Sequence, residues 1–187
     1  MGNRERLLDG AKQCLYAKGY RATTARDVAT AAGVSLAAIG YHFGSTEALL
    51  NQALFEAVAE WSEELGRALS AGGDKDTPAE RFEAIWTAVL ATFAAHRPLW
   101  AIQFELIGNV DHAPDIREFL VTAQRRGRDE LAALFAGVDP ATDAPGARQL
   151  GAFHQALLAG VMTQWLVDPD EAPSARELAE ALRAAAQ

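Results

Sequence analysis

The sequence predicts an all-α fold, and three features of its 187 residues support this prediction. Apolar residues recur at helical spacing through most of the chain, whereas the alternating pattern of a strand is nearly absent. Glycines and prolines are few, and several stand where the helical pattern stops. Half of the residues are hydrophobic, which is enough for a buried core. The length fits one domain, or a small domain joined to a medium-sized one.

The first helix is expected over residues 7–18, where apolar side chains share one face and Gly19 follows as the helix-ending residue. Cys14 lies on that face, and no neighbouring group would lower the pKa of its thiol. We therefore interpret Cys14 as a small core residue and not as a nucleophile. A single cysteine cannot form an internal disulfide, which fits a reducing compartment.

Two short helices joined by a tight turn are expected next. Thr24 is a good N-cap, and Asp27 three residues later completes an approximate capping box. Gly33 can take the positive φ needed where the first short helix stops. We expect Ser35 to cap the helix that follows. The pattern over residues 24–43 predicts a helix-turn-helix, whose second helix fits the major groove of B-DNA.

The rest of the chain continues as a series of helices. A long helix is expected from Ser45 to Leu69, before the clearest break in the chain at residues 71–78. Further helices are expected over residues 82–96, 98–107, 114–137 and 150–165, and from Ser174 as a final N-cap. A loop is expected between the last two of these ranges, at residues 138–146.

The helix-turn-helix and its flanks closely resemble the TetR family of bacterial repressors. The resemblance lies in the turn at Gly33, in Tyr41-His42-Phe43-Gly44-Ser45, in Glu47-Ala48-Leu49-Leu50, and in the earlier stretches Arg6-Leu7-Leu8, Gly19-Tyr20 and Thr23-Thr24. It is strong over about the first 60 residues and much weaker beyond them.

This resemblance implies a three-helix DNA-binding domain over residues 1–46 and a six-helix effector-binding and dimerisation domain over residues 47–187. It implies a repressor that binds a near-palindromic double-stranded operator as a homodimer and is released by a small lipophilic effector. An alternative with the same fold is a ligand-binding or interaction protein with weak or no DNA binding. Two departures from the common family pattern favour that alternative: Gly40 replaces a bulky tyrosine, and Thr46 replaces a lysine.

Carried over position by position, the resemblance implies DNA contacts at Thr24, Ser35, Leu36, Ala37, Ala38, Gly40, Tyr41, His42 and Thr46. Tyr41 and His42 would donate hydrogen bonds to backbone phosphates. The alternative is an aromatic cluster that only seals the domain, and we adopt it for Phe43. The apolar side chains of this set offer mainly contacts to thymine methyl groups. Shape and phosphate contacts are therefore expected to carry much of the discrimination.

The distribution of charge permits DNA binding although the net charge is −8. Residues 1–48 hold six basic and four acidic side chains, so the acidic excess lies further along the chain. Phosphate affinity depends on local positive charge. Outside this region the only dense basic cluster is Arg125, Arg126 and Arg128. We interpret it as a solvated, ion-paired helix face, with a second anion site as the alternative.

An effector site is expected among aromatic and polar side chains of the C-terminal domain. The candidate residues are Trp86, Phe93, Trp100, Gln103, Phe104, His154 and Trp165. The alternative for each aromatic residue is ordinary core packing. The dimer interface implied by the resemblance includes Leu157, Leu158, Val161 and Trp165 of the helix at 150–165. Its alternative is a helix buried within one chain.

No enzymatic activity, cofactor or metal site is expected. The four histidines are widely spread, and none of the common catalytic or metal-binding motifs is present. Metal binding by His112 with Asp111 and Asp115 is conceivable, but their spacing is unspecific. The N-terminus lacks the apolar stretch of a secretory signal, and no apolar run is long enough to span a bilayer. We expect a soluble, cytoplasmic protein.

Overall fold

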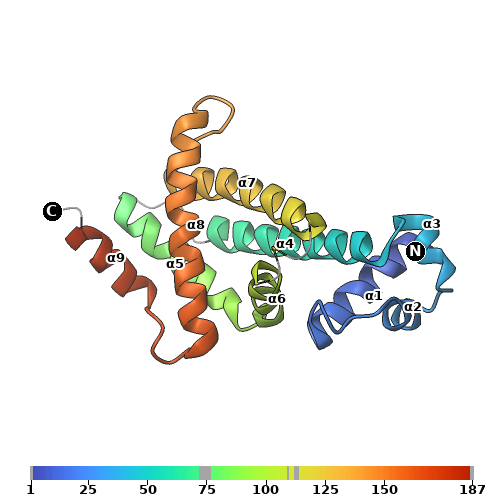
Figure 1. Ribbon diagram of the computed structural model, residues 1–187. Coiled ribbons are helices and arrows are strands. Elements are labelled where there is room, and N and C mark those ends of the chain that lie inside the picture. The colour runs from blue at the N-terminus through green and yellow to red at the C-terminus, as the bar shows by residue number, and fades with distance from the viewer. Residues whose placement is uncertain (1, 72–76, 109, 112–113, 186–187) are drawn as a thin grey trace. The chain divides into compact units, whose positions relative to one another are not determined.

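Nine helices make up the described part of the computed structural model, and no strand occurs there, which confirms the all-α prediction (Figure 1). The structure describes residues 2–71, 77–108, 110–111 and 114–185. The helices are α1 (Asn3–Lys18), α2 (Ala25–Ala32), α3 (Ala37–Phe43), α4 (Thr46–Ala71), α5 (Pro78–Phe93), α6 (Arg97–Ile107), α7 (Pro114–Ala136), α8 (Ala144–Val167) and α9 (Ala175–Ala185). None of the described helices combines the length and the apolar character needed to cross a lipid bilayer.

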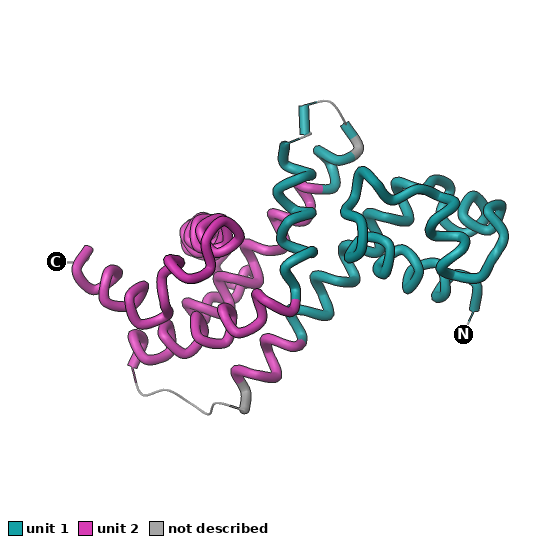
Figure 2. Tube along the Cα trace, turned by 90° about the horizontal axis from the view of Figure 1, so that it is seen from below, with its two compact units in different colours: residues 1–63, 96–119 teal, residues 64–95, 120–187 magenta. Residues whose placement is uncertain are grey.

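The helices group into two compact units, coloured separately in Figure 2. The first unit consists of residues 1–63 and 96–119, and the second of residues 64–95 and 120–187. Helix α6 therefore belongs to the same unit as the helix-turn-helix, which its position in the sequence did not indicate. The functional division predicted between residues 46 and 47 stays a prediction.

The core of the first unit joins α1 to the helices that follow it. Helix α1 buries Leu7, Leu8 and Leu15, and α2 packs against α1 through Val28. Gly10 allows this close approach, because a Cβ atom there would lie 2.9 Å from the backbone nitrogen of Ala32. Two aromatic contacts involve the part of α4 that belongs to this unit. Trp61 meets Trp100 of α6 at 4.8 Å between ring centroids, and Phe55 meets Phe119 of α7 at 4.6 Å.

The core of the second unit is aromatic. Phe82 and Trp86 of α5 lie against Phe135 of α7, with ring centroids 5.7 and 6.0 Å away. The His154 ring of α8 stacks on the Phe135 ring at 4.3 Å. Helix α9 packs along α5, as Figure 1 shows. Helices α7 and α8 cross so closely that a Cβ atom on Gly151 would collide with the carbonyl of Arg128.

Capping groups explain where several helices begin. Ser174 caps α9 as predicted, because its backbone nitrogen donates to Glu177 at 2.8 Å and its hydroxyl accepts from the Glu177 amide. The loop predicted at residues 138–146 is too long, since α8 already begins at Ala144. Asp143 accepts a hydrogen bond from Gly146 N at 2.9 Å, and Pro145 occupies the first turn, where a proline is tolerated.

The expectation that Ser35 caps the second motif helix is wrong. Leu36 occupies the N-cap position of α3 with helical angles of φ −57° and ψ −35°, and no side chain caps it. The carbonyls of Ser35 and Leu36 instead accept from Ala38 N and Ile39 N, at 3.0 and 3.2 Å. Tight backbone turns of this kind start the helix without a side-chain oxygen.

Candidate nucleic-acid interface

Helix α2 is fixed at its start by a complete capping box. The Thr24 hydroxyl accepts from Asp27 N at 3.2 Å, and the Asp27 carboxylate accepts from Thr24 N at 3.0 Å. Lys18 at the end of α1 donates to the same carboxylate at 2.6 Å. The hydrogen bond from Lys18, followed by those from Thr24, holds the pKa of the Asp27 carboxyl well below its usual range. The start of α2 is thereby tied to α1.

The turn between α2 and α3 depends on glycine. Gly33 adopts φ 62° and ψ 39°, a left-handed conformation that confirms the prediction for this position. Arg6 of α1 donates from its guanidinium to the Gly33 carbonyl at 3.1 Å. Val34 N donates to the Ala29 carbonyl at 3.0 Å and so closes the turn. The direction in which α3 leaves α2 is therefore fixed from both helices before it.

Helix α3 turns one side inward and exposes the other. Ile39 is buried, whereas the Tyr41 side chain is 85% exposed and Leu36 is 54% exposed. Phe43 is half-buried, with the Arg4 guanidinium over its ring at 5.4 Å from the centroid. His42 is half-buried and meets the Tyr41 ring edge-on at 4.8 Å. This geometry leaves a tyrosine hydroxyl and an apolar surface facing solvent.

Most of the predicted DNA contacts lie on exposed positions of the first unit. Thr24, Ser35, Leu36, Ala37, Gly40 and Tyr41 are exposed, while Ala38, His42 and Thr46 are half-buried. Gly40 has open space around it, since nothing lies within 4 Å of the position that a Cβ atom would take. Eight of these nine residues lie in α3 or directly beside it, between Ser35 and Thr46, and Thr24 is the N-cap of α2.

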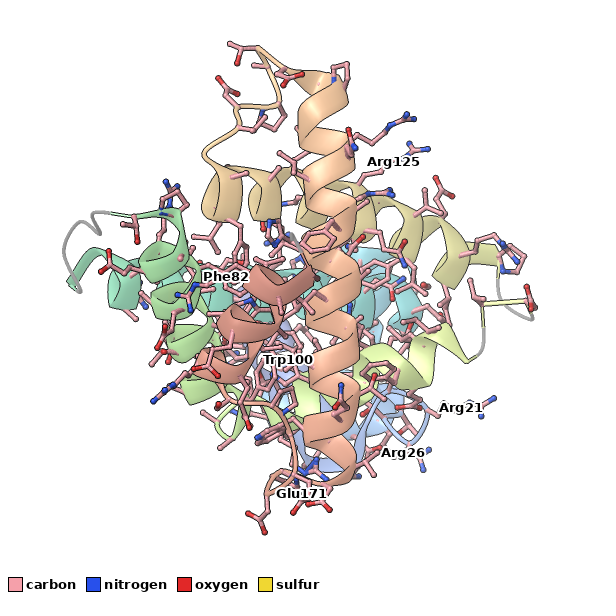
Figure 3. The ribbon with its side chains drawn as sticks, turned by 90° about the vertical axis from the view of Figure 1, so that its left-hand side faces the viewer. Arg21, Arg26, Phe82, Trp100, Arg125 and Glu171 are labelled. Carbon is pink, nitrogen blue, oxygen red and sulfur yellow. The ribbon has the colours of Figure 1, made fainter. Side chains whose placement is uncertain are left out.

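Ion pairs occupy some of the basic residues of α1 and α2 and of the loop between them, but leave others available. Lys12 pairs with Glu60 of α4 at 2.7 Å, and Lys18 pairs with Asp27 at 2.6 Å. Arg21 and Arg26 form no side-chain ion pair with the described residues, and both are exposed (Figure 3). Sequence reasoning counted these two arginines only as charge. The ion pairs of Lys12 and Lys18 show that Arg21 and Arg26 are among the cations left available. Composition alone does not reveal these pairs, because it does not show which acidic residues lie nearby.

The predicted effector residues fall in both compact units. In the first unit, Trp100 is buried, Phe104 is half-buried and Gln103 is exposed. In the second unit, Trp86, Phe93 and His154 are buried and Trp165 is half-buried. The structure brings Phe93 and Trp165 together, with ring centroids 5.4 Å apart.

Two buried polar atoms stand out in the second unit. Trp86 Nε1 and His154 Nδ1 have no hydrogen-bond partner in the described structure. Both rings border Phe82 and Phe135, which sequence reasoning missed as members of this cluster. Burial lowers the pKa of His154, so the ring is neutral at pH 7. Unpaired buried polar groups each cost about 1–3 kcal/mol, and a ligand that paired them would recover part of this.

Helix α8 has one buried and one exposed side. Val161 is only 1% exposed and so belongs to the core of its own unit, whereas Leu157, Leu158 and Trp165 are half-buried. The opposite side presents a row of mainly small or apolar residues to solvent. The row consists of Ala152, Phe153, Ala156, Ala159, Gly160, Thr163 and Val167.

The structure gives little support to a second anion site or to a metal site outside this interface. Arg126 pairs with Glu130 at 2.7 Å, which agrees with the interpretation of that basic cluster as an ion-paired face. The described residues contain no group of three or more histidine, cysteine, aspartate or glutamate side chains placed to hold a metal ion. His112 lies outside the described residues, so the metal site considered there is not tested.

Comparisons with known proteins cover both parts of the chain. The family model described as bacterial regulatory proteins, TetR family, matches residues 7–53. The model described as the C-terminal part of BetI-type transcriptional repressors matches residues 78–187.

Two curated relatives match the N-terminal region. The HTH-type transcriptional repressor KstR2 of Rhodococcus jostii is 42% identical over 53 residues, which are 28% of this chain and 26% of that protein. The uncharacterised HTH-type transcriptional regulator YvkB of Bacillus subtilis is 50% identical over 52 residues, or 26% of this chain and 28% of that protein. The matched stretch thus spans about a quarter of each relative.

Solved structures of other regulators match nearly the whole chain, and two of them illustrate the likeness. A putative transcriptional regulator from Streptomyces coelicolor gives a TM-score of 0.69 at 24% identity, over 96% of this chain and 95% of that one. A putative transcriptional regulator from Saccharomonospora viridis, solved in complex with choline, gives 0.66 at 23% identity, over 97% and 93%. At these identities the likeness shows the fold.

Proposed function

The chain belongs to the TetR family and is a transcriptional regulator, and from this premise we propose that it is a repressor that binds a near-palindromic operator as a homodimer. The observation that carries the proposal is the exposed side of α3. Its Tyr41 side chain is 85% exposed, although large aromatic side chains are usually mostly buried. A helix whose one side is held in the core and whose other side faces solvent suits insertion into the major groove.

Contacts to phosphate would orient α3 in the groove. Tyr41 and His42 would donate hydrogen bonds to the DNA backbone, as would Thr46 near the start of α4. Thr24 already donates from its backbone nitrogen and its hydroxyl to Asp27, so at the start of α2 the backbone amides of the first turn would contact phosphate instead. Arg21 and Arg26 add two positive charges that no described acidic group neutralises. Such contacts supply affinity for any sequence.

Reading of the bases would come from the exposed N-terminal part of α3. Leu36, Ala37 and Ala38 offer apolar surface to thymine methyl groups in the major groove. Gly40 adds no side chain, so the backbone of α3 can approach the base edges closely there. With few donors and acceptors available, sequence preference would depend strongly on DNA shape.

The dimer would form through the exposed side of α8, together with α9. A single DNA-binding domain contacts too few base pairs for specific binding, so two such domains related by a two-fold axis are needed. The exposed row on α8 includes Gly160 and Ala156, which would let two copies of the helix approach closely. The half-buried Leu157, Leu158 and Trp165 would border this contact. Val161, buried in its own chain, would support the helix from behind.

A small effector in the C-terminal region would release the DNA. Our candidate position is the aromatic cluster of Phe82, Trp86, Phe135 and His154, because it holds the unpaired Trp86 Nε1 and His154 Nδ1. The Saccharomonospora viridis neighbour contains choline, and aromatic faces attract such cations. Helix α4 runs from the first compact unit into the second, so a shift of α4 would change the separation of the two DNA-binding domains of the dimer.

Selection from a random library of DNA duplexes tests this function. We expect the purified protein to enrich two half-sites in inverted orientation, separated by about one helical turn of 10–10.5 base pairs or a multiple of it. Enrichment of no sequence would contradict the repressor function and favour a ligand-binding protein without DNA binding. Small apolar compounds and choline are then added to the complex with the selected duplex, and release of the DNA identifies the effector class.

A further inference from the structure

A carboxylate of α6 holds the loop that leads into the helix-turn-helix. The Glu105 side chain accepts hydrogen bonds from two consecutive backbone amides, Tyr20 N at 3.1 Å and Arg21 N at 2.8 Å. Each of its two oxygens takes one of these bonds. Hydrogen bonds from backbone amides to a carboxylate are stronger than those between neutral groups. Glu105 therefore forms a two-point contact between α6 and the loop between α1 and α2, all within the first compact unit.

The loop is shaped to receive this carboxylate. Gly19 adopts φ 80°, a conformation that side-chain-bearing residues rarely take. A Cβ atom on Gly19 would also lie only 3.1 Å from Glu105 Oε2, so any larger residue would crowd the contact. Successive amides that follow such a backbone turn form a small concave site for an anion. The glycine and the glutamate thus suit each other, although 86 positions separate them in the sequence.

Hydrogen bonds within the loop connect it directly to the start of α2. Thr23 donates from its hydroxyl to the Gly19 carbonyl at 2.7 Å, and Thr23 N donates to the Tyr20 carbonyl at 3.3 Å. The next residue, Thr24, is the N-cap of α2. No flexible stretch therefore lies between the amides that Glu105 holds and the first helix of the motif.

Other contacts hold the same loop or the same helix from different sides. The Tyr20 hydroxyl donates to Asn51 Oδ1 of α4 at 2.9 Å, and the Tyr20 side chain is buried. Near the start of α6, the Tyr16 hydroxyl lies 3.4 Å from His96 Nδ1. Helix α6 thus meets α1 at one end and the loop at the other. The loop that leads into α2 is therefore held by α6 as well as by α1 and α4.

We propose that Glu105 is a positioning residue for DNA reading, which sets the orientation of α3 through the Tyr20–Arg21 amides. The inference rests on the proposed DNA-binding function. It adds that α6 affects this function through the contact of Glu105 with the loop between α1 and α2. A movement of α6 that withdrew Glu105 would leave two amides unpaired and free the loop. Sequence-specific binding would weaken, because base contacts require a fixed helix orientation, whereas non-specific phosphate contacts tolerate several.

Two substitutions separate this positioning role from a simple effect of charge. Glu105→Gln removes one negative charge, which by electrostatics alone would strengthen binding to every DNA sequence. Glu105→Asp keeps the charge but shortens the side chain, so that the carboxylate no longer reaches both amides. We expect both variants to bind the duplex selected by the wild-type protein about tenfold more weakly, which is the effect of one charge-assisted hydrogen bond. Their affinity for an unrelated duplex should not fall.

Glu118 provides the matched control in the same compact unit. Its side chain is exposed, and Glu118→Gln and Glu118→Asp change charge and length in the same way. We expect both control variants to keep the wild-type ratio of specific to non-specific affinity. The proposal is overturned if the Glu105 variants keep that ratio as well. This includes the case in which their affinity for both duplexes falls by the same factor, which would indicate general destabilisation of the protein.

Amide hydrogen exchange decides the question even if the wild-type protein selects no DNA. The Tyr20 and Arg21 amides are expected to exchange slowly in the full chain and faster in Glu105→Gln, while the buried amides of α1 remain protected in both. An absence of DNA selection with this exchange result would reject the proposed function but keep the contact. Unchanged exchange of these two amides in Glu105→Gln would reject the contact itself.

Discussion

Tyr41 is the residue on which the proposed reading of DNA depends most. It stands two positions after the buried Ile39 on a helix of seven residues, and its hydroxyl faces solvent. Its ring meets the His42 ring edge-on, with centroids 4.8 Å apart, and is largely open to solvent. A hydroxyl at this position is accessible to a backbone phosphate and can donate a hydrogen bond to it.

Replacing Tyr41 by phenylalanine should weaken DNA binding without altering sequence preference. The ring and its contact with His42 remain, while the hydrogen bond to phosphate is removed, at a cost of about 0.5–1.5 kcal/mol. Titrations against the selected duplex and an unrelated one should both show affinity reduced by about threefold to tenfold. A reduction confined to the selected duplex would instead assign Tyr41 to base reading.

His154 makes the stability of the second unit depend on pH. Burial lowers the pKa of this ring in the folded state, so the unfolded chain takes up a proton first as the pH falls. The stabilising effect of a neutral His154 is therefore complete above the unfolded pKa of about 6.5 and declines below it.

We expect the wild-type protein to lose more stability between pH 7 and pH 5 than His154→Phe, which keeps an aromatic ring beside Phe135. Urea unfolding of both proteins at the two pH values measures this difference. The comparison cancels the contribution of every other titrating group. Equal decreases in the two proteins would show that His154 does not carry the pH dependence.

At the scale of the helices, local signals in the sequence predict where most elements begin and end. The capping box of Thr24 and Asp27, the left-handed Gly33 and the cap at Ser174 were all predictable, because each involves neighbours in the chain. The start of α3 was not, since backbone turns there replace the expected Ser35 cap.

The grouping of helices was less accessible to sequence reasoning. Periodicity shows which side of a helix is apolar, but not which other helix covers it. The contact between Trp61 and Trp100 and the bonds from the Tyr20–Arg21 amides to Glu105 place α6 in the first unit. Both involve residues far apart in the sequence, and no local pattern marks either pair.

The crossing of α1 and α2 gives a prediction at this scale. Gly10→Ala should destabilise the protein by about 1–3 kcal/mol, because the new Cβ atom would meet the backbone of Ala32 and Val28 and push α2 away. Alanine otherwise favours a helix over glycine by about 1 kcal/mol. Gly66→Ala in α4 is the matched control and should be neutral or stabilising, because nothing lies within 4 Å of the position that its Cβ atom would take. Thermal unfolding of the two variants compares these effects, and a stabilised Gly10→Ala would refute the close crossing.

At the scale of the whole molecule, charge is distributed so that an acidic protein can still bind DNA. The net charge is −8, yet the region of α1 to α3 carries Arg21 and Arg26 without acidic partners among the described residues. Binding should therefore depend strongly on salt, since each phosphate contact made by a cation releases a counterion.

Arg21→Gln and Arg26→Gln should each reduce the slope of log affinity against log salt by about one, because each substitution removes one cation from a phosphate. Arg125→Gln in the second unit is the control and should leave the slope unchanged. Binding titrations at several salt concentrations measure the slope. If neither Arg21→Gln nor Arg26→Gln changed it, the assignment of these arginines to phosphate would be wrong.

The exposed row on α8 leads to a prediction about assembly. Gly160→Arg should convert the dimer to a monomer in sedimentation at micromolar concentration, because a long charged side chain would separate the two copies of α8. Gly160 has open space around it within the chain, so each protomer should remain folded by circular dichroism. Ala91→Arg, at an exposed position of α5, is the control and should stay dimeric. A monomeric wild-type protein would contradict the dimer.

The central claim is that the exposed side of α3 enters the major groove, and methylation interference on the selected duplex tests it most directly. Methyl groups on guanine N7 project into the major groove, and those on adenine N3 project into the minor groove. We predict that N7 methylation of guanines in both half-sites blocks binding, whereas N3 methylation of adenines in the same half-sites has little effect. Binding that N7 methylation leaves intact and N3 methylation abolishes would contradict the account.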